Sequence, residues 1–257
     1  MVIIMSIRQK AEFVFKFPYN LVAVFTNPFY FVRKNLYKNI SKYSEYITGR
    51  TLDFGCGSKP YKDLFPKVTE YIGLDIEDQR HGFGADTVDV FYDGQTIPFD
   101  DETFDSMFSS EVYEHVPNLD RILTEMNRVL KTCGAGGGYM VVTVPFVWNE
   151  HGVPYDYKRF TSYGIKQKLE EHGFEVIDIT KSTGFIQLLA QMWVEYLRGC
   201  SERIKHSVFR RIIHIAVIIP SIILGEILSL ILPGNDTFYA DNIVLCKKCR
   251  KVVKEGN

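Results

Sequence analysis

The sequence lacks an excess of charge of either sign. Its 257 residues include 30 Lys and Arg and 31 Asp and Glu, which gives a formal net charge of −1. A broad nucleic-acid surface needs a basic face that displaces counterions from phosphates. The composition therefore argues against nucleic acid as a partner.

Cysteine is scarce. Five cysteines at uneven spacing make no disulfide framework in a chain of this length, which favours a reducing compartment and a cytoplasmic protein. Cys246 and Cys249 form one C-x-x-C pair, but no second Cys or His pair stands at the spacing that would complete four zinc ligands. The sequence therefore predicts no metal site.

A secretory signal is also missing. The opening apolar stretch MVIIM is short, precedes the first charges and is followed by no small-residue cleavage site. Residues 1–45 mix Phe and Tyr with Lys and Arg. This mixture predicts a helical segment that either packs on the domain or lies on a membrane surface.

From residue 50 onward, short apolar runs alternate with helical stretches. This alternation is typical of a parallel sheet with crossover helices, and the chain length suits one α/β domain. One helix is expected from the apolar spacing over residues 119–130, and another between Thr161 or Ser162 as N-cap and Gly173. Seven strands are expected near residues 51–54, 70–75, 86–91, 103–109, 138–144, 174–181 and 240–247.

Residues 185–235 form an apolar insertion before the last strand. Its centre is long enough to cross a bilayer, about 20 residues, but one full span would separate the last strand from its sheet. Two alternatives remain: a helical cap packed on the domain, or a shallow hairpin broken near Pro220 that dips into one leaflet. The basic residues that would suit anionic lipid are Lys205, Arg210, Arg211, Lys247, Lys248, Arg250 and Lys251.

The stretch TLDFGCGSKPY, residues 51–61, places two glycines directly after the first strand. Gly55 and Gly57 permit backbone angles and a close approach that a side chain would block. A dinucleotide turn, G-x-G-x-x-G, needs a third glycine where this chain has Pro60, and Asp53 puts a negative charge where a diphosphate would lie. S-adenosylmethionine fits better, because Asp53 can attract its ammonium group. Asp75, at the end of the next strand, is placed to bind ribose hydroxyls, as in NAD enzymes.

Several motifs in order resemble the class I S-adenosylmethionine-dependent methyltransferases, and more closely their type 11 branch. LDFGCG is similar to the first motif of that family, YIGLD to its ribose-binding strand end, and DGQTIPFDDETFDSMFSSEVYEHVPN to its central signature. The resemblance implies a Rossmann-like fold, with the cofactor-binding domain over residues 46–184 and 236–257. The implied cofactor contacts are Asp53, Gly55, Cys56, Gly57, Asp75, Ile76, Asp93 beside the adenine amino group, Gly94 and Ser110. Cys56 is interpreted as a small space filler rather than a nucleophile.

Two histidines follow strand ends that should face the cleft, because ligands of open parallel sheets bind at the carboxyl ends of the strands. A hydroxyl nucleophile needs a base, and His151 is the preferred candidate. His115 is either a second catalytic residue or a structural one bonded to a backbone carbonyl. Asp156 either orients His151 or forms a salt bridge that holds the loop with Arg159.

The loop HGVPYDYKRFT, residues 151–161, resembles one in type 11 relatives that accompany bacterial glycan synthesis. The expected substrate contacts are Glu111, Tyr155, Tyr157 and Arg159, and Glu114 is a further residue near the methionine end or the substrate. The expected function is therefore methyl transfer from S-adenosylmethionine to a small-molecule acceptor, with an oxygen of a sugar or lipid-linked glycan intermediate preferred.

Two alternatives to this function remain. An NAD-linked oxidoreductase shares the sheet and Asp75, although the third glycine is missing. A non-catalytic, methyltransferase-like module that interacts with a membrane is the other alternative. If residues 185–235 contact lipid, the expected location is the inner face of a membrane.

Overall fold

The computed structural model describes residues 27–77, 87–134 and 138–249. The chain divides into two compact units, which we call the helical unit (residues 1–38 and 181–240) and the sheet unit (residues 39–180 and 241–257). The sequence-based boundaries at 45, 184 and 235 treat the N-terminal segment and the insertion separately, whereas the helical unit combines parts of both. The predictions for residues 1–26, Arg250 and Lys251 lie outside the described residues.

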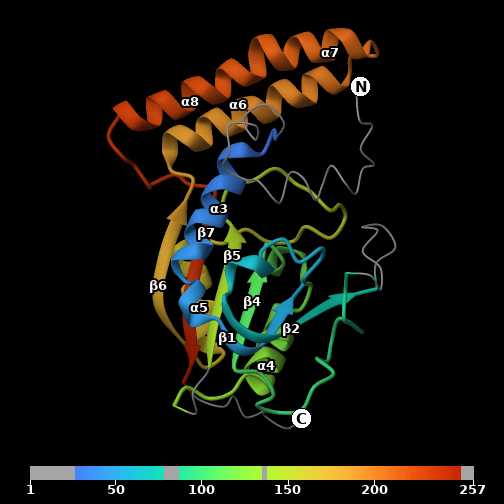
Figure 1. Cartoon of the computed structure of the whole chain (residues 1–257), viewed down its shortest axis with the longest axis vertical. Helices are drawn as coiled ribbons and strands as arrows, with labels where there is room; N and C mark the ends of the chain where they lie inside the picture. The colour runs from blue at the N-terminus through green and yellow to red at the C-terminus, as the bar shows by residue number, and fades with distance from the viewer. Residues whose placement is uncertain (1–26, 78–86, 135–137, 250–257) are drawn as a thin grey trace. The chain divides into compact units, whose positions relative to one another are not determined.

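All seven expected strands are present in one sheet, in the order β3-β2-β1-β4-β5-β7-β6 (Figure 1). β1 pairs in parallel with β2 and β4, as does β2 with β3 and β4 with β5, whereas β7 runs antiparallel to β5. This confirms the α/β class and the mostly parallel sheet. The strands are β1 (Thr48–Phe54), β2 (Lys67–Ile76), β3 (Val90–Tyr92), β4 (Ser106–Ser110), β5 (Tyr139–Pro145), β6 (Phe174–Ser182) and β7 (Asp241–Lys248).

The central strands β1, β4 and β5 contain nearly continuous runs of buried residues. Such runs, rather than strict alternation, are expected where both faces of a parallel sheet are covered. The sheet reverses its winding between β1 and β4, since the chain moves outward from β1 to β3 on one side and continues from β4 on the other. Ligands of open α/β sheets bind at the carboxyl ends of the strands beside such a reversal.

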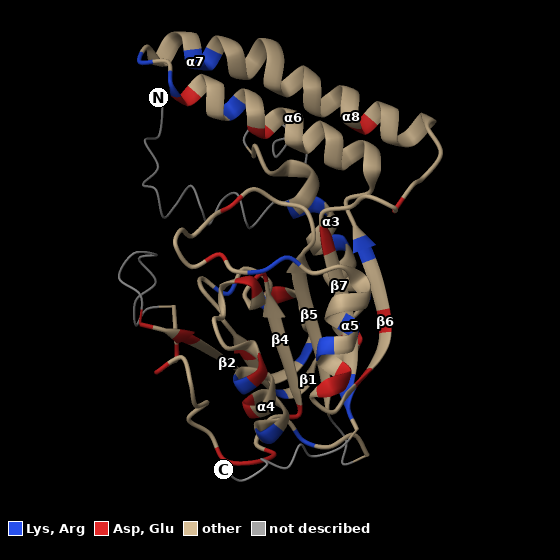
Figure 2. Cartoon of the chain, turned by 180° about the vertical axis from the view of Figure 1, so that it is seen from behind, with Lys and Arg blue, Asp and Glu red and all other residues tan. Residues whose placement is uncertain are grey.

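Helices α4 (Leu119–Val129) and α5 (Ser162–Glu171) lie side by side on one face of the sheet (Figure 2). The Asn118 side chain caps α4 by accepting from the backbone N–H of Arg121, and Thr161 caps α5 by accepting from that of Gly164. Short 3₁₀ turns occupy Ser44–Tyr46 (η1), Lys62–Leu64 (η2) and Tyr113–His115 (η3). The apolar face of α4 that the sequence predicts is buried, and comprises Leu119, Ile122, Leu123, Met126 and Val129.

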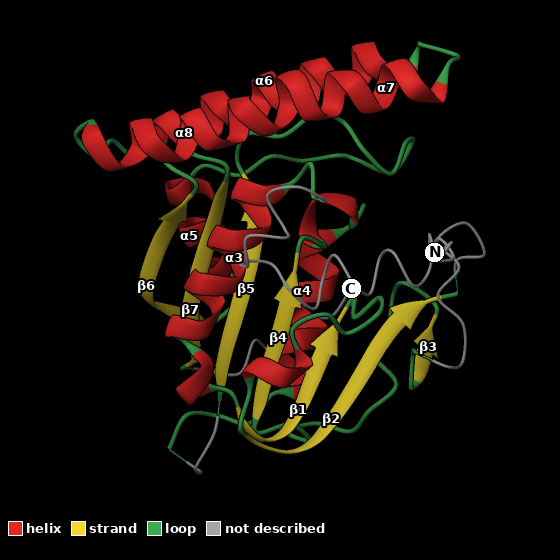
Figure 3. Ribbon diagram, turned by 45° about the horizontal axis from the view of Figure 1, so that its top comes forward, coloured by secondary structure: helices red, strands yellow, loops and turns green. Residues whose placement is uncertain are grey.

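The helical unit contains the start of α3 (Tyr30–Lys42), α6 (Phe185–Glu202), α7 (Ser207–Ile213), a π-helical turn η4 (His214–Ile218) and α8 (Ile219–Ile231). The last three form one helix that runs back along α6 (Figure 3). The predicted break near Pro220 is therefore wrong, because the chain reverses between α6 and α7 and the helix continues through the proline. Proline lacks an N–H and crowds the preceding turn, and the wider π-helical turn directly before it relieves that conflict.

The helical unit has a small core of its own, where Phe31 of α3 is fully buried among Val194, Ile218 and Ile222. Gly225 allows this close packing, since a Cβ at that position would lie 2.5 Å from the Cβ of Ala190. The insertion is thus held by packing among its own helices and against α3.

Candidate active site

Backbone hydrogen bonds of two glycines hold the turn after β1. Gly55 has a φ of +70° and donates its N–H to the Leu74 carbonyl at 2.8 Å. A Cβ at Gly55 would lie 2.4 Å from Cγ2 of Val112, so the segment after β4 packs directly against this turn. Gly57, with a φ of +48°, donates its N–H to Oδ2 of Asp75 at 2.9 Å. These contacts bring the first glycine motif, the end of β2 and the end of β4 to one place.

Asp53 is a buried carboxylate just before this turn. Its surface is 2% exposed, and its Oδ2 accepts from the Tyr71 hydroxyl at 2.7 Å. Burial raises the pKa of Asp53 to about 7, although the Tyr71 hydrogen bond acts in the opposite direction. A cationic ligand would stabilise the ionised form of this buried carboxyl group. The sequence predicts such a role for Asp53, as the partner of an ammonium group.

Cys56 lies buried between the two glycines. Burial raises the pKa of its thiol well above the ordinary value, which opposes formation of a thiolate nucleophile. This agrees with its interpretation as a space filler.

The predicted nucleoside contacts lie together at the carboxyl edge of β2 and β3. These strands are parallel neighbours, and Ile76 is opposite Tyr92. Asp75 accepts from the backbone of Gly57 and, at 2.8 Å, from that of Ile76. Asp93 is exposed, next to Gly94, and its Oδ1 accepts from the N–H groups of Gln95 and Thr96, both at 2.8 Å. These hydrogen bonds lower the pKa of Asp93, which favours its ionised form.

Ser110 and Glu111 end β4 beside β5. The Ser110 hydroxyl lies 2.8 Å from that of Thr143, which donates to Oε1 of Glu111 at 2.7 Å. Glu111 has a φ of +56°, a left-handed conformation that is costly for a residue with a side chain. Such conformations concentrate at functional sites, and neither composition nor spacing had signalled this one.

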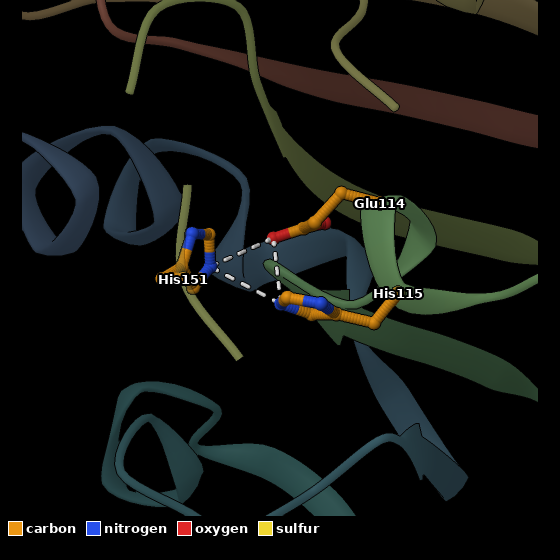
Figure 4. A group of neighbouring side chains, drawn as sticks. All are labelled: Glu114, His115 and His151. Carbon is orange, nitrogen blue, oxygen red and sulfur yellow. Dashed lines mark hydrogen bonds and ion pairs between the residues drawn. The ribbon is translucent and has the colours of Figure 1, made fainter. Parts of the chain in front are cut away.

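Glu114, His115 and His151 converge from two segments, the η3 turn after β4 and the loop after β5 (Figure 4). The Nε2 atoms of the two histidines are 3.1 Å apart. Oε1 of Glu114 lies 3.6 Å from Nε2 of His115 and 3.8 Å from Nε2 of His151. Glu114 has no exposed surface. Neither of its carboxylate oxygens has a hydrogen-bond partner in the part of the chain that the structure describes.

Backbone carbonyls orient both histidine rings. Nδ1 of His115 lies 2.8 Å from the Tyr155 carbonyl, and Nδ1 of His151 lies 3.2 Å from that of Asn149. Because a carbonyl can only accept, these contacts favour a hydrogen on Nδ1 of each ring, and the Nε2 atoms face one another. Burial lowers the pKa of His115, which favours the neutral ring. The backbone contact predicted for a structural His115 is therefore present, together with a contact to His151.

Asp156 links the loop to His151. Arg159 binds both carboxylate oxygens of Asp156, at 2.5 and 2.6 Å, and holds the pKa of Asp156 down at about 2. Oδ2 of Asp156 also accepts from the His151 backbone N–H at 3.0 Å and lies 3.5 Å from Nδ1 of the same residue. The salt bridge and the orientation of His151 were predicted as alternatives, and this geometry contains both.

Tyr155 and Tyr157 stand at the exposed side of the same loop. Their surfaces are 42% and 46% exposed, and their ring centroids lie 6.4 Å apart in a T-shaped arrangement. The Tyr157 N–H donates to the Glu114 carbonyl at 2.9 Å, which ties this loop to the η3 turn. The rings offer two faces at the site, but they do not stack on one another.

The sequence considered His115 and His151 as separate candidates and Glu114 only as an unranked neighbour. The structure brings the three residues together, although the two histidines are 36 positions apart in the sequence. The one sequence signal for the group was the adjacent Glu114–His115 pair after a strand that ends in the cleft.

A seven-stranded sheet of this order, a two-glycine turn after β1 and acids at the ends of β2 and β3 define the class I methyltransferase fold. Residues 52–136 match the model of the methyltransferase 11 family, described as a methyltransferase domain. This part of the chain is thus a methyltransferase type 11 domain, which confirms the resemblance found in its motifs.

Two curated relatives each match 42% of the chain. Phthiotriol/phenolphthiotriol dimycocerosates methyltransferase 1 of Mycobacterium ulcerans is 31% identical over 122 residues, 42% of this chain and 42% of that protein. The fatty-acid O-methyltransferase of Mycolicibacterium smegmatis is 30% identical over 118 residues, 42% of this chain and 41% of that protein. The chain therefore spans less than half the length of these two relatives.

The fold extends to more distant solved structures. One is phosphoethanolamine N-methyltransferase 2 of Haemonchus contortus, solved with phosphomonomethylethanolamine and S-adenosylhomocysteine. It superposes with a TM-score of 0.52 at 16% identity, over 94% of this chain and 58% of that one. At this identity the likeness shows the fold alone.

Proposed function

We propose that this protein is an S-adenosylmethionine-dependent methyltransferase that acts on an oxygen atom of a small molecule. The observation that carries the proposal is the turn after β1, where Gly57 donates to Asp75 inside a segment that matches the methyltransferase 11 family. The solved neighbour that contains S-adenosylhomocysteine supports the same cofactor. An NAD-linked function is less well supported, because Pro60 stands where a dinucleotide turn has its third glycine.

The residues at the strand ends fit the cofactor in a definite order. Asp53 would attract the ammonium, the Gly55–Gly57 backbone would line the methionine portion, and Asp75 would bind the ribose hydroxyls. Asp93, at the end of β3, is placed for the adenine amino group. When bound, the cofactor supplies an electrophilic methyl group on a sulfonium. The protein mainly has to align an acceptor atom with that methyl group.

We assign activation of the acceptor to Glu114, His115 and His151. The two imidazoles point their Nε2 atoms toward one another, and Asp156 contacts the backbone N–H of His151. They follow β4 and β5, at the edge of the sheet where the cofactor is expected. An acceptor hydroxyl that reaches this group would lie beside two imidazole nitrogens and a buried carboxyl group.

The preferred acceptor is a lipid or an acyl compound. The curated fatty-acid O-methyltransferase supports an oxygen nucleophile on an apolar molecule. The sugar or lipid-linked glycan predicted from the sequence depends on Tyr155 and Tyr157 as ring-binding surfaces, which are exposed at the site. A lipid-linked sugar would combine both features and belongs in the acceptor screen.

The helical unit supports contact with a membrane surface. Its helix Ser207–Ile231 is long and apolar enough to span a bilayer, with a mean hydropathy of 2.2 and only 22% of its most apolar window buried. A single span is disfavoured, because β6 and β7, which precede and follow this unit, belong to one sheet. The large exposed apolar side chains of this unit are Leu189, Met192, Trp193, Tyr196, Val208, Phe209, Ile212, Ile215, Val217, Ile223, Leu224, Ile227, Leu230, Ile231 and Leu232.

Basic residues surround the turn between α6 and α7 (Figure 2). Arg203, Lys205, Arg210 and Arg211 are all exposed, against one exposed acid, Glu202. An apolar helix face with basic residues at one end complements an anionic lipid surface. We therefore propose a cytoplasmic protein that binds the inner face of a membrane, where an apolar acceptor would be found.

The cofactor assignment is tested by calorimetric titration with S-adenosylhomocysteine. Asp75→Ala should weaken binding by about 10- to 100-fold, the effect of losing a charged hydrogen-bond acceptor. Asp63→Ala, which removes an exposed aspartate from η2, should bind like the wild type. Binding of NAD instead of S-adenosylhomocysteine would support the oxidoreductase. Failure to bind either would support a non-catalytic module.

The acceptor and the membrane contact need separate measurements. Release of S-adenosylhomocysteine should be stimulated by fatty acids or lipid-linked sugars more than by free sugars. In flotation assays, the protein should rise with anionic vesicles, and Leu230→Glu, at a position 82% exposed, should reduce this without affecting folding. Arg210→Glu should reduce binding to anionic vesicles only. A wild-type protein that fails to float with any vesicle would contradict the membrane proposal.

A further inference from the structure

We propose that Glu114, His115 and His151 bind a divalent first-row transition ion, with Zn²⁺ as the preferred ion and one coordination position left open. The site rests on its own geometry. Its use in catalysis, to hold the oxygen of the acceptor, rests on the proposed function.

The three ligand atoms have the separations that such an ion requires. Nε2 of His115, Nε2 of His151 and Oε1 of Glu114 form a triangle with sides of 3.1, 3.6 and 3.8 Å. The point equidistant from all three lies about 2.0 Å from each atom, which follows from those sides alone. Zinc binds imidazole nitrogen at about 2.0–2.1 Å and carboxylate oxygen at about 2.0–2.2 Å. The three separations therefore leave room for an ion of this kind between the ligand atoms.

The contacts around the three ligands also suit a central cation. Both Nδ1 atoms lie at hydrogen-bond distance from backbone carbonyls, and the two Nε2 atoms face one another at 3.1 Å. The carboxyl group of Glu114 is the third ligand, fully buried and without a hydrogen-bond partner in the described part of the chain. A cation between these three groups would interact favourably with all of them.

A shared proton is the competing explanation. A proton on one ring would join the two Nε2 atoms in a hydrogen bond, but Oε1 of Glu114, at 3.6 and 3.8 Å, would remain beyond hydrogen-bond distance. The buried carboxylate would then still lack a hydrogen bond, a state that native proteins rarely keep. A metal ion satisfies all three groups at once.

The surroundings resemble the outer shell of a metal site. Metal-binding histidines usually donate the other ring N–H to a carbonyl or a carboxylate, which fixes the tautomer. Here the carbonyls belong to Tyr155 and Asn149, and the Asp156 carboxylate lies 3.5 Å from Nδ1 of His151. Arg159 in turn holds Asp156 through two hydrogen bonds. The loop therefore orients both histidine rings through hydrogen bonds of the kind that surround metal ligands.

The site is closed on one side and open on the other. The Glu114 side chain is fully buried, whereas those of His115 and His151 are 28% and 36% exposed. Two histidines and one glutamate with a free fourth position are the ligand set of catalytic rather than structural zinc. Solvent or an acceptor can reach that position from the histidine side.

The ligands lie at the same end of the sheet as the cofactor turn. The Gly55 turn packs against Val112, two residues before Glu114, so the cofactor turn and the metal ligands share one end of the sheet. An ion held by these residues would make a bound acceptor hydroxyl more acidic, and the proton would pass to solvent. Attack of that oxygen on the methyl carbon would break the bond from carbon to sulfur. The sulfonium would become a neutral thioether, so charge and atoms balance.

The test is a Zn²⁺ titration of chelator-treated protein in competition with a chromophoric chelator. The wild type should bind one ion per chain, and Glu114→Gln and His151→Ala should each bind at least about tenfold more weakly. His206→Ala removes an exposed histidine from the helical unit and should leave the affinity unchanged. Co²⁺ in place of Zn²⁺ should give a visible d–d spectrum that is lost in the Glu114 variant.

The controls separate this inference from the proposed function. Titration with S-adenosylhomocysteine shows whether each variant is folded around an intact cofactor turn. A wild type that binds the cofactor product but not Zn²⁺ overturns the metal site and leaves the methyltransferase. Zn²⁺ binding that Glu114→Gln and His151→Ala do not change also overturns it. Zn²⁺ binding that these variants weaken, in a protein that binds no S-adenosylhomocysteine, supports the metal site and refutes the methyltransferase.

Discussion

Asp53→Asn should stabilise the cofactor-free protein and weaken its affinity for the cofactor. The wild-type carboxylate is buried, with its pKa raised from 3.8 to about 7. The amide is neutral at every pH, has nearly the same shape and can still accept from the Tyr71 hydroxyl. The substitution therefore removes the cost of a buried charge and also removes the charge that the ammonium group needs.

The size of the effect follows from the pKa shift. Between pH 3.8 and 7 the folded protein holds a proton on Asp53 that the unfolded chain has released, so wild-type stability falls as pH rises through this window and levels off above it. The shift of about 3 pKa units corresponds to about 4 kcal/mol, at about 1.4 kcal/mol per unit. About 2 to 3 kcal/mol of this lies between pH 5 and pH 8.

The assay is urea unfolding of wild type and Asp53→Asn at both pH values. The free energy of unfolding of the variant, relative to wild type, should rise by that amount from pH 5 to pH 8. Calorimetry should show that S-adenosylhomocysteine binds the wild type more tightly as pH rises to 7, with proton release, and binds the variant at least about tenfold more weakly with no such dependence. A stability difference that is the same at both pH values would refute the reasoning, as would an unchanged affinity.

Three further tests concern the surrounding structure. Gly55→Ala and Gly94→Ala both place a side chain at positive φ, but the new Cβ lies 2.4 Å from Val112 in the first and no closer than 3.9 Å to Ile76 in the second. Urea unfolding should thus show Gly55→Ala to be less stable than Gly94→Ala by about 1–3 kcal/mol of overpacking, and equal stabilities would contradict the packing. Thr161→Ala removes the cap of α5 and should cost about 1 kcal/mol, whereas Thr161→Ser should not. Arg159→Lys loses the two-point contact with Asp156 and should lower kcat without changing the KM for S-adenosylmethionine; a change confined to KM would place Arg159 elsewhere in the mechanism.

The strands, the buried face of α4 and the glycine turn could be predicted because their signals are local. A run of buried apolar residues, a helical repeat over residues 119–130 or a glycine after a strand expresses a constraint between neighbours in the chain. The family resemblance could be predicted for the same reason, because its motifs are short stretches that follow one another in order along the chain. The alternative with a break near Pro220 was wrong, because the tendency of proline to interrupt a helix was overridden by helix packing. This packing involves Phe31 and Gly225, which are distant in the sequence.

The sequence by itself determined the fold class, the cofactor turn at Gly55 and Gly57, and the acids at positions 53, 75 and 93. Only the tertiary structure decided which of the candidate catalytic residues lie together. His115 and His151 meet because β4 and β5 are adjacent, parallel strands whose following segments emerge at the same edge of the sheet. The burial of Glu114 beside them, without a hydrogen-bond partner among the described residues, depends on the Tyr155–Arg159 loop that folds over it. Spacing along a chain cannot reveal such a group, because its members are joined by the sheet and not by a repeat.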